Sequence, residues 1–199
     1  DIDKEKTIGE EMDLSHGLPY APQKMVIKAG DYDECNDAQI VVITAGAAQK
    51  PGQTRLELAE TNTKIMKQIT QNIMESGFNG IIIVASNPVD LMTYVVAEVS
   101  GLPKNKVIGS GTILDTARLR YLLADYLKVS SKNVHAYIMG EHGDSSFVPW
   151  SHTYVGCKKL TKLYKAKGMG MDYLESIHKE VVNSAYEIIN RKGATYYGI

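Results

Sequence analysis

The sequence predicts an α/β protein, in which a doubly wound, Rossmann-type parallel sheet that lacks its first strand is followed by a mixed α+β domain. Two runs rich in β-branched residues, at residues 39–44 and 80–86, are separated by a long helical pattern. Buried strands that alternate with helices are typical of parallel sheets. The pattern changes after Gly109-Ser-Gly111, so we expect one domain at residues 1–110 and a second at residues 111–199.

The elements follow from periodicity and turn residues. Ile8, Met12 and Leu14 recur at helical spacing, which predicts a short amphipathic helix over residues 4–14 that ends before Gly17. Residues 24–29 are expected to form a strand, and a turn rich in aspartate joins them to the strand at 39–44. We then expect a helix through Met74, strands at 80–86 and 106–109, helices at 88–100 and 112–127, a strand at 153–157 and a helix at 171–192.

Composition and charge exclude several classes of protein. The 22 basic and 23 acidic residues give a net charge of −1, which provides no electrostatic footprint for nucleic acid or an anionic membrane. Apolar runs are only strand-sized. Cys35 and Cys157 lie far apart without metal-ligand spacing, which argues against a disulfide framework and a zinc site. A reducing, cytoplasmic location is expected.

The two ends of the sequence are abrupt. The chain opens on Asp1 without an initiator methionine, and it stops just after a helical pattern. We therefore expect both domains to be truncated. In the strand order 3-2-1-4-5-6 the first strand is central, so these 199 residues alone are expected to be unstable and prone to aggregation.

Three segments resemble, in order and spacing, the signatures of the lactate/malate dehydrogenase superfamily. They are Gln49-Lys-Pro-Gly-Gln-Thr-Arg55, Leu114-Asp-Thr-Ala-Arg-Leu-Arg120 and Gly140-Glu-His-Gly-Asp-Ser145. The segments at residues 84–90 and 193–199 are similar to the same family. The resemblance is closest to bacterial L-lactate dehydrogenases that fructose 1,6-bisphosphate activates. It implies NAD as cofactor, pyruvate and L-lactate as substrates, and a homotetramer.

One family feature is absent from the sequence. The glycine-rich GxGxxG turn that cradles the cofactor pyrophosphate does not occur between residues 1 and 199. Asp1 resembles the acidic residue that accepts hydrogen bonds from the adenosine ribose, which favours NAD over NADP. The NAD assignment therefore depends on the resemblance and on indirect features.

His142 is the candidate proton-transfer group. Reduction of a 2-oxo acid by a nicotinamide needs a proton donor at the carbonyl oxygen, and histidine suits that role near neutral pH. Of five histidines, His142 lies in a glycine-flanked loop that follows a strand. The alternative is a structural histidine, and the resemblance favours catalysis.

Asp115 and Arg118 stand three residues apart on one predicted helix. They can form an ordinary ion pair on its surface. The resemblance implies instead that Asp115 orients His142 and that Arg118 binds the substrate carboxylate through its planar fork.

Arg120 is two residues after Arg118, and at about 100° per residue it points to roughly the opposite side of the predicted helix. The resemblance implies that Arg120 and His135 bind fructose 1,6-bisphosphate between subunits. The alternative is a solvated arginine and an edge-strand histidine.

Four residues are candidates for substrate and cofactor contacts. Residues 45–54 are rich in small residues and follow a buried strand, so we expect a mobile lid. The resemblance implies that Gln49 on this lid meets the substrate side group and that Arg55 polarises the carbonyl. A plain surface loop is the alternative. Asn87 follows the next strand and is expected to contact substrate or nicotinamide ribose, unless Asn-Pro only forms a turn. Thr195 resembles the small polar residue of the family that closes the substrate pocket near the methyl group.

Two other functions stay open at this point. A close relative, malate or branched 2-hydroxy acid dehydrogenase, would use the same residues. A non-catalytic binding module would keep the fold without turnover, although the joint presence of His142, Asp115, Arg118 and Arg55 argues against it.

Overall fold

The chain divides into two compact units, residues 1–109 and 110–199, which are described separately. The computed structural model describes residues 1–47, 55–166 and 170–193. In the described part, none of the helices is both long enough and apolar enough to cross a membrane.

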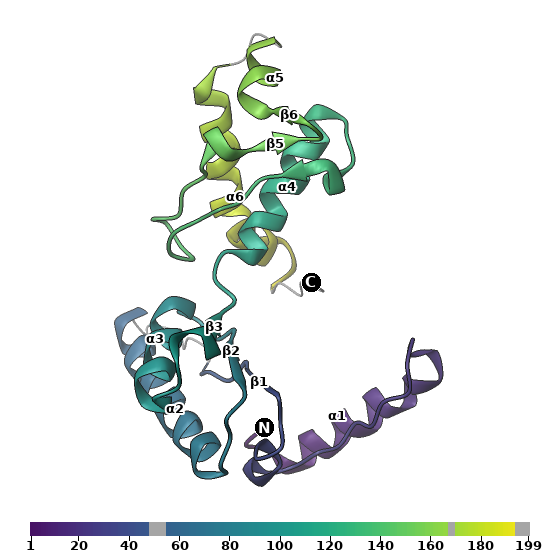
Figure 1. Cartoon of the computed structure of the whole chain (residues 1–199), viewed down its shortest axis with the longest axis vertical. Coiled ribbons are helices and arrows are strands. Elements are labelled where there is room, and N and C mark those ends of the chain that lie inside the picture. Colours follow the sequence, from purple (N-terminus) through teal and green to yellow (C-terminus); the bar gives the residue numbers. More distant parts are fainter. Residues whose placement is uncertain (48–54, 167–169, 194–199) are drawn as a thin grey trace. The chain divides into compact units, whose positions relative to one another are not determined.

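A parallel three-stranded sheet is the centre of the first unit (Figure 1). Its order is β1-β2-β3, formed by Ile40–Ile43, Ile81–Val84 and Val107–Gly109. Helices α2 (Arg55–Glu75) and α3 (Val89–Ser100) connect consecutive strands and pack side by side against the sheet. The predicted parallel α/β architecture is confirmed.

The core of this unit lies between the sheet and its two helices. Buried side chains from all three layers form it: Ile43, Met66, Ile73, Phe78, Ile82, Val84, Met92, Val96 and Val107. Ile40 and Val42 of β1 are more than half exposed, because alternate side chains of a strand point to opposite faces. One face of the sheet is thus covered by helices, whereas Ile40 and Val42 on β1 stay exposed.

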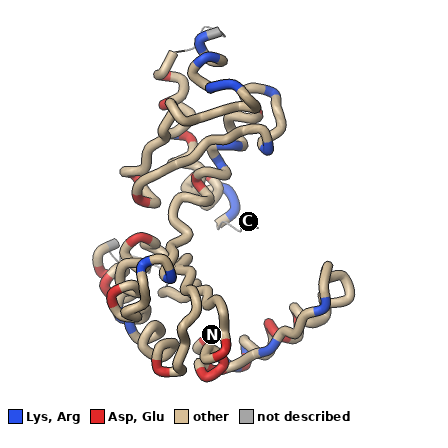
Figure 2. Tube along the Cα trace, viewed as in Figure 1, with Lys and Arg blue, Asp and Glu red and all other residues tan. Residues whose placement is uncertain are grey.

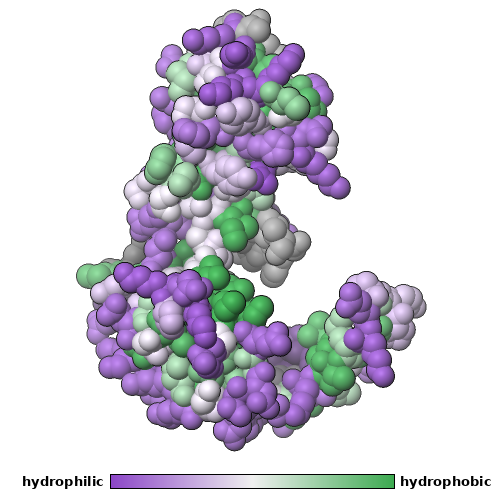
Figure 3. Space-filling model, in the orientation of Figure 1, coloured by the Kyte–Doolittle hydropathy of each residue, from purple (hydrophilic) through white to green (hydrophobic). Residues whose placement is uncertain are grey.

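The N-terminal segment consists of a helix and a stretch of chain that runs back beside it. Helix α1 (Lys4–His16) begins at Asp3, whose carboxylate caps the amide of Lys6. Residues 18–30 run back along this helix, and Ala29 N–H donates to a carboxylate oxygen of Glu11 at 2.9 Å. Figure 3 shows hydrophobic surface on this segment, where Met12 and Val26 are exposed.

One prediction for this unit is wrong. Residues 24–29 do not form a strand, because in the described residues no neighbouring strand pairs with them. The expected turn that follows contains a 3-10 helix, η2 (Tyr32–Cys35). β-branched content alone indicates an extended chain, but a strand also needs a hydrogen-bonding partner.

The second unit combines helices with a small antiparallel sheet. Helix α4 (Ile113–Leu127) packs against α6 (Met171–Lys192), beside the strands β4 (Val134–His135), β5 (Tyr154–Val155) and β6 (Lys158–Lys159). Leu119, Leu123, Leu174, Ile177 and Val181 are almost fully buried between the two helices and the sheet. The mixed α+β architecture is confirmed.

In the second unit, the structure differs from the sequence prediction only in short segments. The strand predicted at 153–157 is only Tyr154–Val155, and helix α5 (Leu160–Ala166) was not predicted. Lysines on β6 and α5 make this part of the unit basic (Figure 2). The predicted helices at 112–127 and 171–192 are confirmed to within one residue.

Candidate functional site

Helix α4 fixes the backbone that leads to the candidate site. Thr112 Oγ1 donates to the carbonyl of Ile138 at 2.6 Å, and the amide of Ile138 donates to Thr116 Oγ1 at 2.9 Å. Two threonines one turn apart thus satisfy both backbone groups of one residue. This clamp holds the segment that leaves β4 against the helix that carries Asp115 and Arg118.

The loop at residues 140–147 presents His142. Its base is closed by Met139 and Phe147, which exchange two backbone hydrogen bonds of 2.9 Å. Gly140 starts the loop with φ of +93°, a conformation in which a side chain is strained. The glycine-flanked loop expected from the sequence therefore has a conformational basis.

Asp115 and His142 form the centre of the site. Oδ2 of Asp115 lies 2.6 Å from Nδ1 of His142, a short hydrogen-bond distance. The Asp115 side chain is 10% exposed and that of His142 27%. The carboxylate is thus largely shielded, whereas the imidazole is reachable from solvent.

Neighbouring charges determine the protonation of Asp115. Burial raises the pKa of Asp115. The hydrogen bond and charge of His142, together with the charge of Arg118, lower it by more than burial raises it, so the pKa lies below its ordinary value of 3.8. The aspartate is therefore ionised at neutral pH. An ionised carboxylate stabilises a protonated imidazole at Nδ1.

Arg118 binds the other oxygen of the same carboxylate. Its Nη1 lies 3.0 Å from Oδ1 of Asp115, and its side chain is 11% exposed. Both functional and structural interpretations of the i,i+3 pair are consistent with this bond. What distinguishes it from a surface pair is that Asp115 also contacts His142.

A second histidine, which the sequence analysis did not single out, lies near this cluster. His178 of α6 has Nε2 3.2 Å from Oγ of Ser146, in the loop of His142. The buried positions of α6 are Leu174, Ile177 and Val181, and His178 lies four residues after Leu174. This helical spacing was the signal that could have placed His178 beside the buried face of the helix.

Arg120 has different neighbours from Arg118. Its Nε donates to the carbonyl of Ala136 at 2.9 Å, and its guanidinium lies 4.8 Å from the ring centroid of Tyr137. His135 is exposed on β4. Since His135 and Tyr137 alternate with buried residues, they face the same side of the segment that Arg120 contacts.

A hollow between α4 and α6 borders Arg118. It has a volume of about 380 Å³, and its described lining includes Glu180 and Glu187 but neither Asp115 nor His142. Two carboxylates disfavour the binding of an anion. The hollow is therefore a poor place for an acidic substrate.

In the first unit, a buried asparagine links two strand ends. Asn62 of α2 accepts from the amide of Ala47 at 2.8 Å and donates to the carbonyl of Asn87 at 3.2 Å. Asn62 is 4% exposed, whereas the Asn87 side chain is exposed at the carboxyl end of β2. The sequence analysis missed Asn62, because an asparagine inside a helical pattern carries no distinctive spacing.

The remaining candidates are placed only in part. Asp1 is exposed at the N-terminus, where its carboxylate accepts from the amide of Asp3. Arg55 is the first residue of α2, and its side chain lies outside the described part. Gln49 and Thr195 lie outside the described residues.

A parallel α/β unit followed by an α+β unit with an Asp–His–Arg cluster is the organisation expected of a two-domain, dinucleotide-dependent dehydrogenase. The chain belongs to the lactate/malate dehydrogenase family. Residues 1–109 match the model of its NAD binding domain, and residues 112–199 match that of its alpha/beta C-terminal domain.

Relatives from several bacteria are similar along the whole chain. L-lactate dehydrogenase 2 of Bacillus cereus is 54% identical, and L-lactate dehydrogenase 1 of Listeria monocytogenes is 55% identical. The chain spans 64% and 63% of their lengths.

Solved structures agree with this assignment. A lactate dehydrogenase from a Medee basin deep-sea metagenome has 56% identity and a TM-score of 0.95. The minor L-lactate dehydrogenase of Enterococcus mundtii, in a ligands-bound form, has 48% identity and a TM-score of 0.96. Each match covers all of this chain and 63% of the other.

The carboxyl ends of β1 and β2 are where a parallel sheet of this kind binds a dinucleotide. Ala45 and Gly46 place only small residues at the end of β1, and the Asn62 side chain lies against Gly46. Asn87 adds an exposed amide at the end of β2, where ligands of parallel sheets bind. Asn62 would hold these two strand ends in place.

Proposed function

We propose that this chain is part of an L-lactate dehydrogenase, which transfers a hydride reversibly between NADH and pyruvate to give L-lactate and NAD+. The observation that carries the proposal is the contact of 2.6 Å between Asp115 and His142. The membership in the lactate/malate dehydrogenase family and the names of its relatives support the choice of substrate.

His142 is the proposed proton donor to the carbonyl oxygen of pyruvate, and the acceptor in the reverse direction. Asp115 holds Nδ1, which directs the proton exchanged with substrate to Nε2. As the carbonyl oxygen gains negative charge, the imidazolium gives up its proton. Asp115 stabilises the charged imidazole before that step.

Arg118 is the proposed ligand of the substrate carboxylate. A guanidinium presents two parallel N–H groups to a carboxylate. Its bond to Asp115 fixes the guanidinium with respect to the carboxylate that also holds His142. One aspartate would therefore set the positions of both the group that binds substrate and the group that protonates it.

The first unit would supply the cofactor-binding site and the lid. NADH provides the hydride when it is bound, and Asn87 and Asp1 are the proposed contacts to nicotinamide and adenosine ribose. Residues 45–54 would close over the substrate, with Gln49 at its side group and Arg55 at its carbonyl. Exclusion of water strengthens these polar interactions.

Two further properties belong to the proposal. Arg120 and His135 would bind fructose 1,6-bisphosphate as an activator between subunits of a homotetramer. The contacts of Arg120 with Ala136 and Tyr137, in the segment that directly follows His135, support this placement. A cytoplasmic location is proposed on the basis of two free cysteines.

The decisive experiment measures NADH oxidation by the complete protein that carries this sequence. Pyruvate, oxaloacetate and a branched 2-oxo acid should each be tested, with and without fructose 1,6-bisphosphate. We expect preference for pyruvate, and a loss of about 10²- to 10⁴-fold in His142→Asn. His152→Asn is the matched control, because His152 is exposed and pairs with Ser151 instead. No turnover of any 2-oxo acid would favour a binding module.

A further inference from the structure

The position of His142 depends on how its loop is held. Within this loop, the amide of Ser146 donates to the carbonyl of Gly143 at 3.3 Å, so the residue after His142 and Ser146 belong to one turn. The loop is closed behind Ser146 by the backbone pair of Met139 and Phe147. A shift of Ser146 would therefore move the backbone beside His142.

Ser146 is held from outside the loop by helix α6. Its hydroxyl lies 3.2 Å from Nε2 of His178, and Ser146 is only 9% exposed. His178 follows the buried Ile177 on the inner stripe of α6. The helix backbone and its packing thus fix the imidazole, and the imidazole fixes the loop.

Building on the proposed function, we propose that His178 is a positioning residue for His142. It binds Ser146 from α6 and so keeps the loop at residues 140–147 in the place where His142 meets Asp115. The loop is then held by two different helices. Asp115 of α4 contacts His142 directly, whereas His178 of α6 acts through Ser146.

The charge state of His178 suits this role. Burial lowers the pKa of His178, the negative charge of Asp115 on α4 raises it, and the net direction is downward. The imidazole is therefore neutral at pH 7. A neutral imidazole can exchange a hydrogen bond with a hydroxyl.

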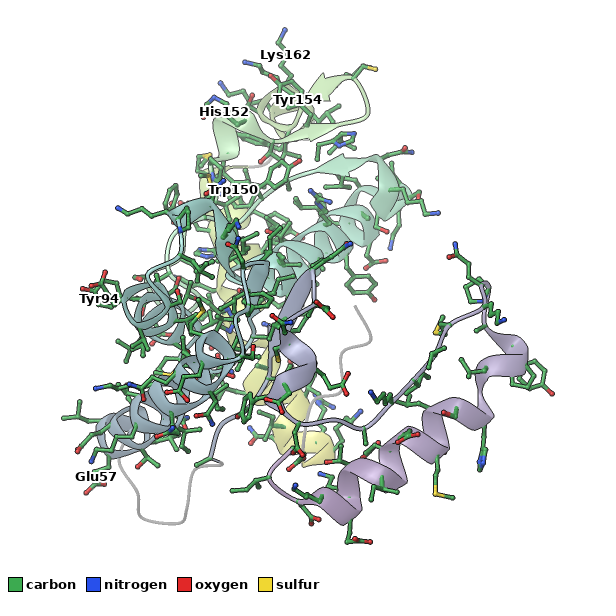
Figure 4. The ribbon with its side chains drawn as sticks, turned by 60° about the horizontal axis from the view of Figure 1, so that its bottom comes forward. Glu57, Tyr94, Trp150, His152, Tyr154 and Lys162 are labelled. Carbon is green, nitrogen blue, oxygen red and sulfur yellow. The ribbon has the colours of Figure 1, made fainter. Side chains whose placement is uncertain are left out.

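The test uses three variants of the complete protein. His178→Leu and Ser146→Ala remove the contact, whereas His178→Gln keeps a polar group at a similar reach. The control is His152→Leu, which removes a second Ser–His contact in the described part of this unit; Figure 4 labels His152 on η5 (Trp150–His152), where it is exposed. Single-turnover hydride transfer and the KM for NADH are measured for each.

We expect His178→Leu and Ser146→Ala to slow hydride transfer about tenfold or more, since a misplacement of about 1 Å can cost about 100-fold. KM for NADH should not change, because both substitutions lie outside residues 1–109, which match the NAD binding domain. His178→Gln should recover most of the rate. A general loss of folding would not slow hydride transfer while leaving the KM for NADH unchanged and letting His178→Gln recover the rate.

Hydrogen exchange gives a second readout that needs no turnover. Amides in residues 140–147 should exchange faster in His178→Leu and Ser146→Ala than in wild type or His152→Leu. If wild type reduces pyruvate and both variants keep its rate and its exchange, His178 has no positioning role. If wild type reduces no 2-oxo acid, the proposed function fails, and unchanged exchange in the variants would separately overturn the anchoring of the loop.

Discussion

Asp115 Oδ2 lies 2.6 Å from His142 Nδ1, although the two residues are 27 positions apart in the sequence. Asp115→Asn would keep the shape of this contact and remove its charge. We expect kcat/KM for pyruvate to fall about 100-fold or more, because the imidazolium loses its stabilising partner. Steady-state assays of the complete protein check this, and a variant within threefold of wild type would contradict the assignment.

Arg118→Lys tests the planar fork. A lysine keeps the positive charge but offers no bidentate geometry to a carboxylate. We expect the KM for pyruvate to rise about tenfold or more, with a smaller change in the KM for NADH. Arg120→Lys, measured without effector, is the matched control on the same helix, because Arg120 contacts Ala136 and Tyr137 instead.

Protonation of His178 should oppose folding. The folded pKa lies below the ordinary value of 6.5, so below that pH the unfolded chain takes up a proton that the folded chain resists. Stability from this residue is present above pH 6.5 and is lost as the pH falls below it. Urea unfolding at pH 7.5 and 5.5 should show a larger loss in wild type than in His178→Gln, and equal losses would disprove the linkage.

The effector residues can be separated from catalysis. If Arg120 and His135 bind fructose 1,6-bisphosphate, Arg120→Gln should abolish activation and leave the unactivated rate nearly unchanged. Full activation of Arg120→Gln would rule out this role.

Substrate choice is tested at Gln49. Oxaloacetate would bury a second carboxylate opposite an uncharged amide, which is unfavourable. Gln49→Arg should add about 2–5 kcal/mol of discrimination, or roughly tens-fold to thousands-fold in relative kcat/KM for oxaloacetate over pyruvate. Both substrates must be measured, because the lid must still close. An unchanged ratio would mean that Gln49 does not face the substrate.

The sequence predicted most of the fold because its main strands are β-branched runs and its main helices are periodic. The strands at Ile40–Ile43 and Ile81–Val84 are β-branched runs, and the pattern of α4 and α6 extends over several turns. The failure at residues 24–29 has a physical cause, since strand formation depends on a neighbour that local sequence does not reveal. Helix α5 is short and begins directly after β6, so its period is hard to detect.

The candidate site was predictable only where a motif marked it. Asp115, Arg118 and His142 lie in segments that resemble family signatures, and the structure brings these three together within one unit. His178 and Asn62 lie in helices and act through single contacts to distant loops. Such contacts depend on tertiary packing, so neither spacing nor composition indicates them.

The clamp of Thr112 and Thr116 on Ile138 has a consequence for engineering. The helix that carries Asp115 and the backbone that leads to His142 are joined within residues 110–199. The contact between Asp115 and His142, the proposed acid–base pair, is therefore built entirely from residues of one unit. Changes to dinucleotide preference in residues 1–109 and changes to acid–base strength in residues 110–199 can be made and combined as separate design problems.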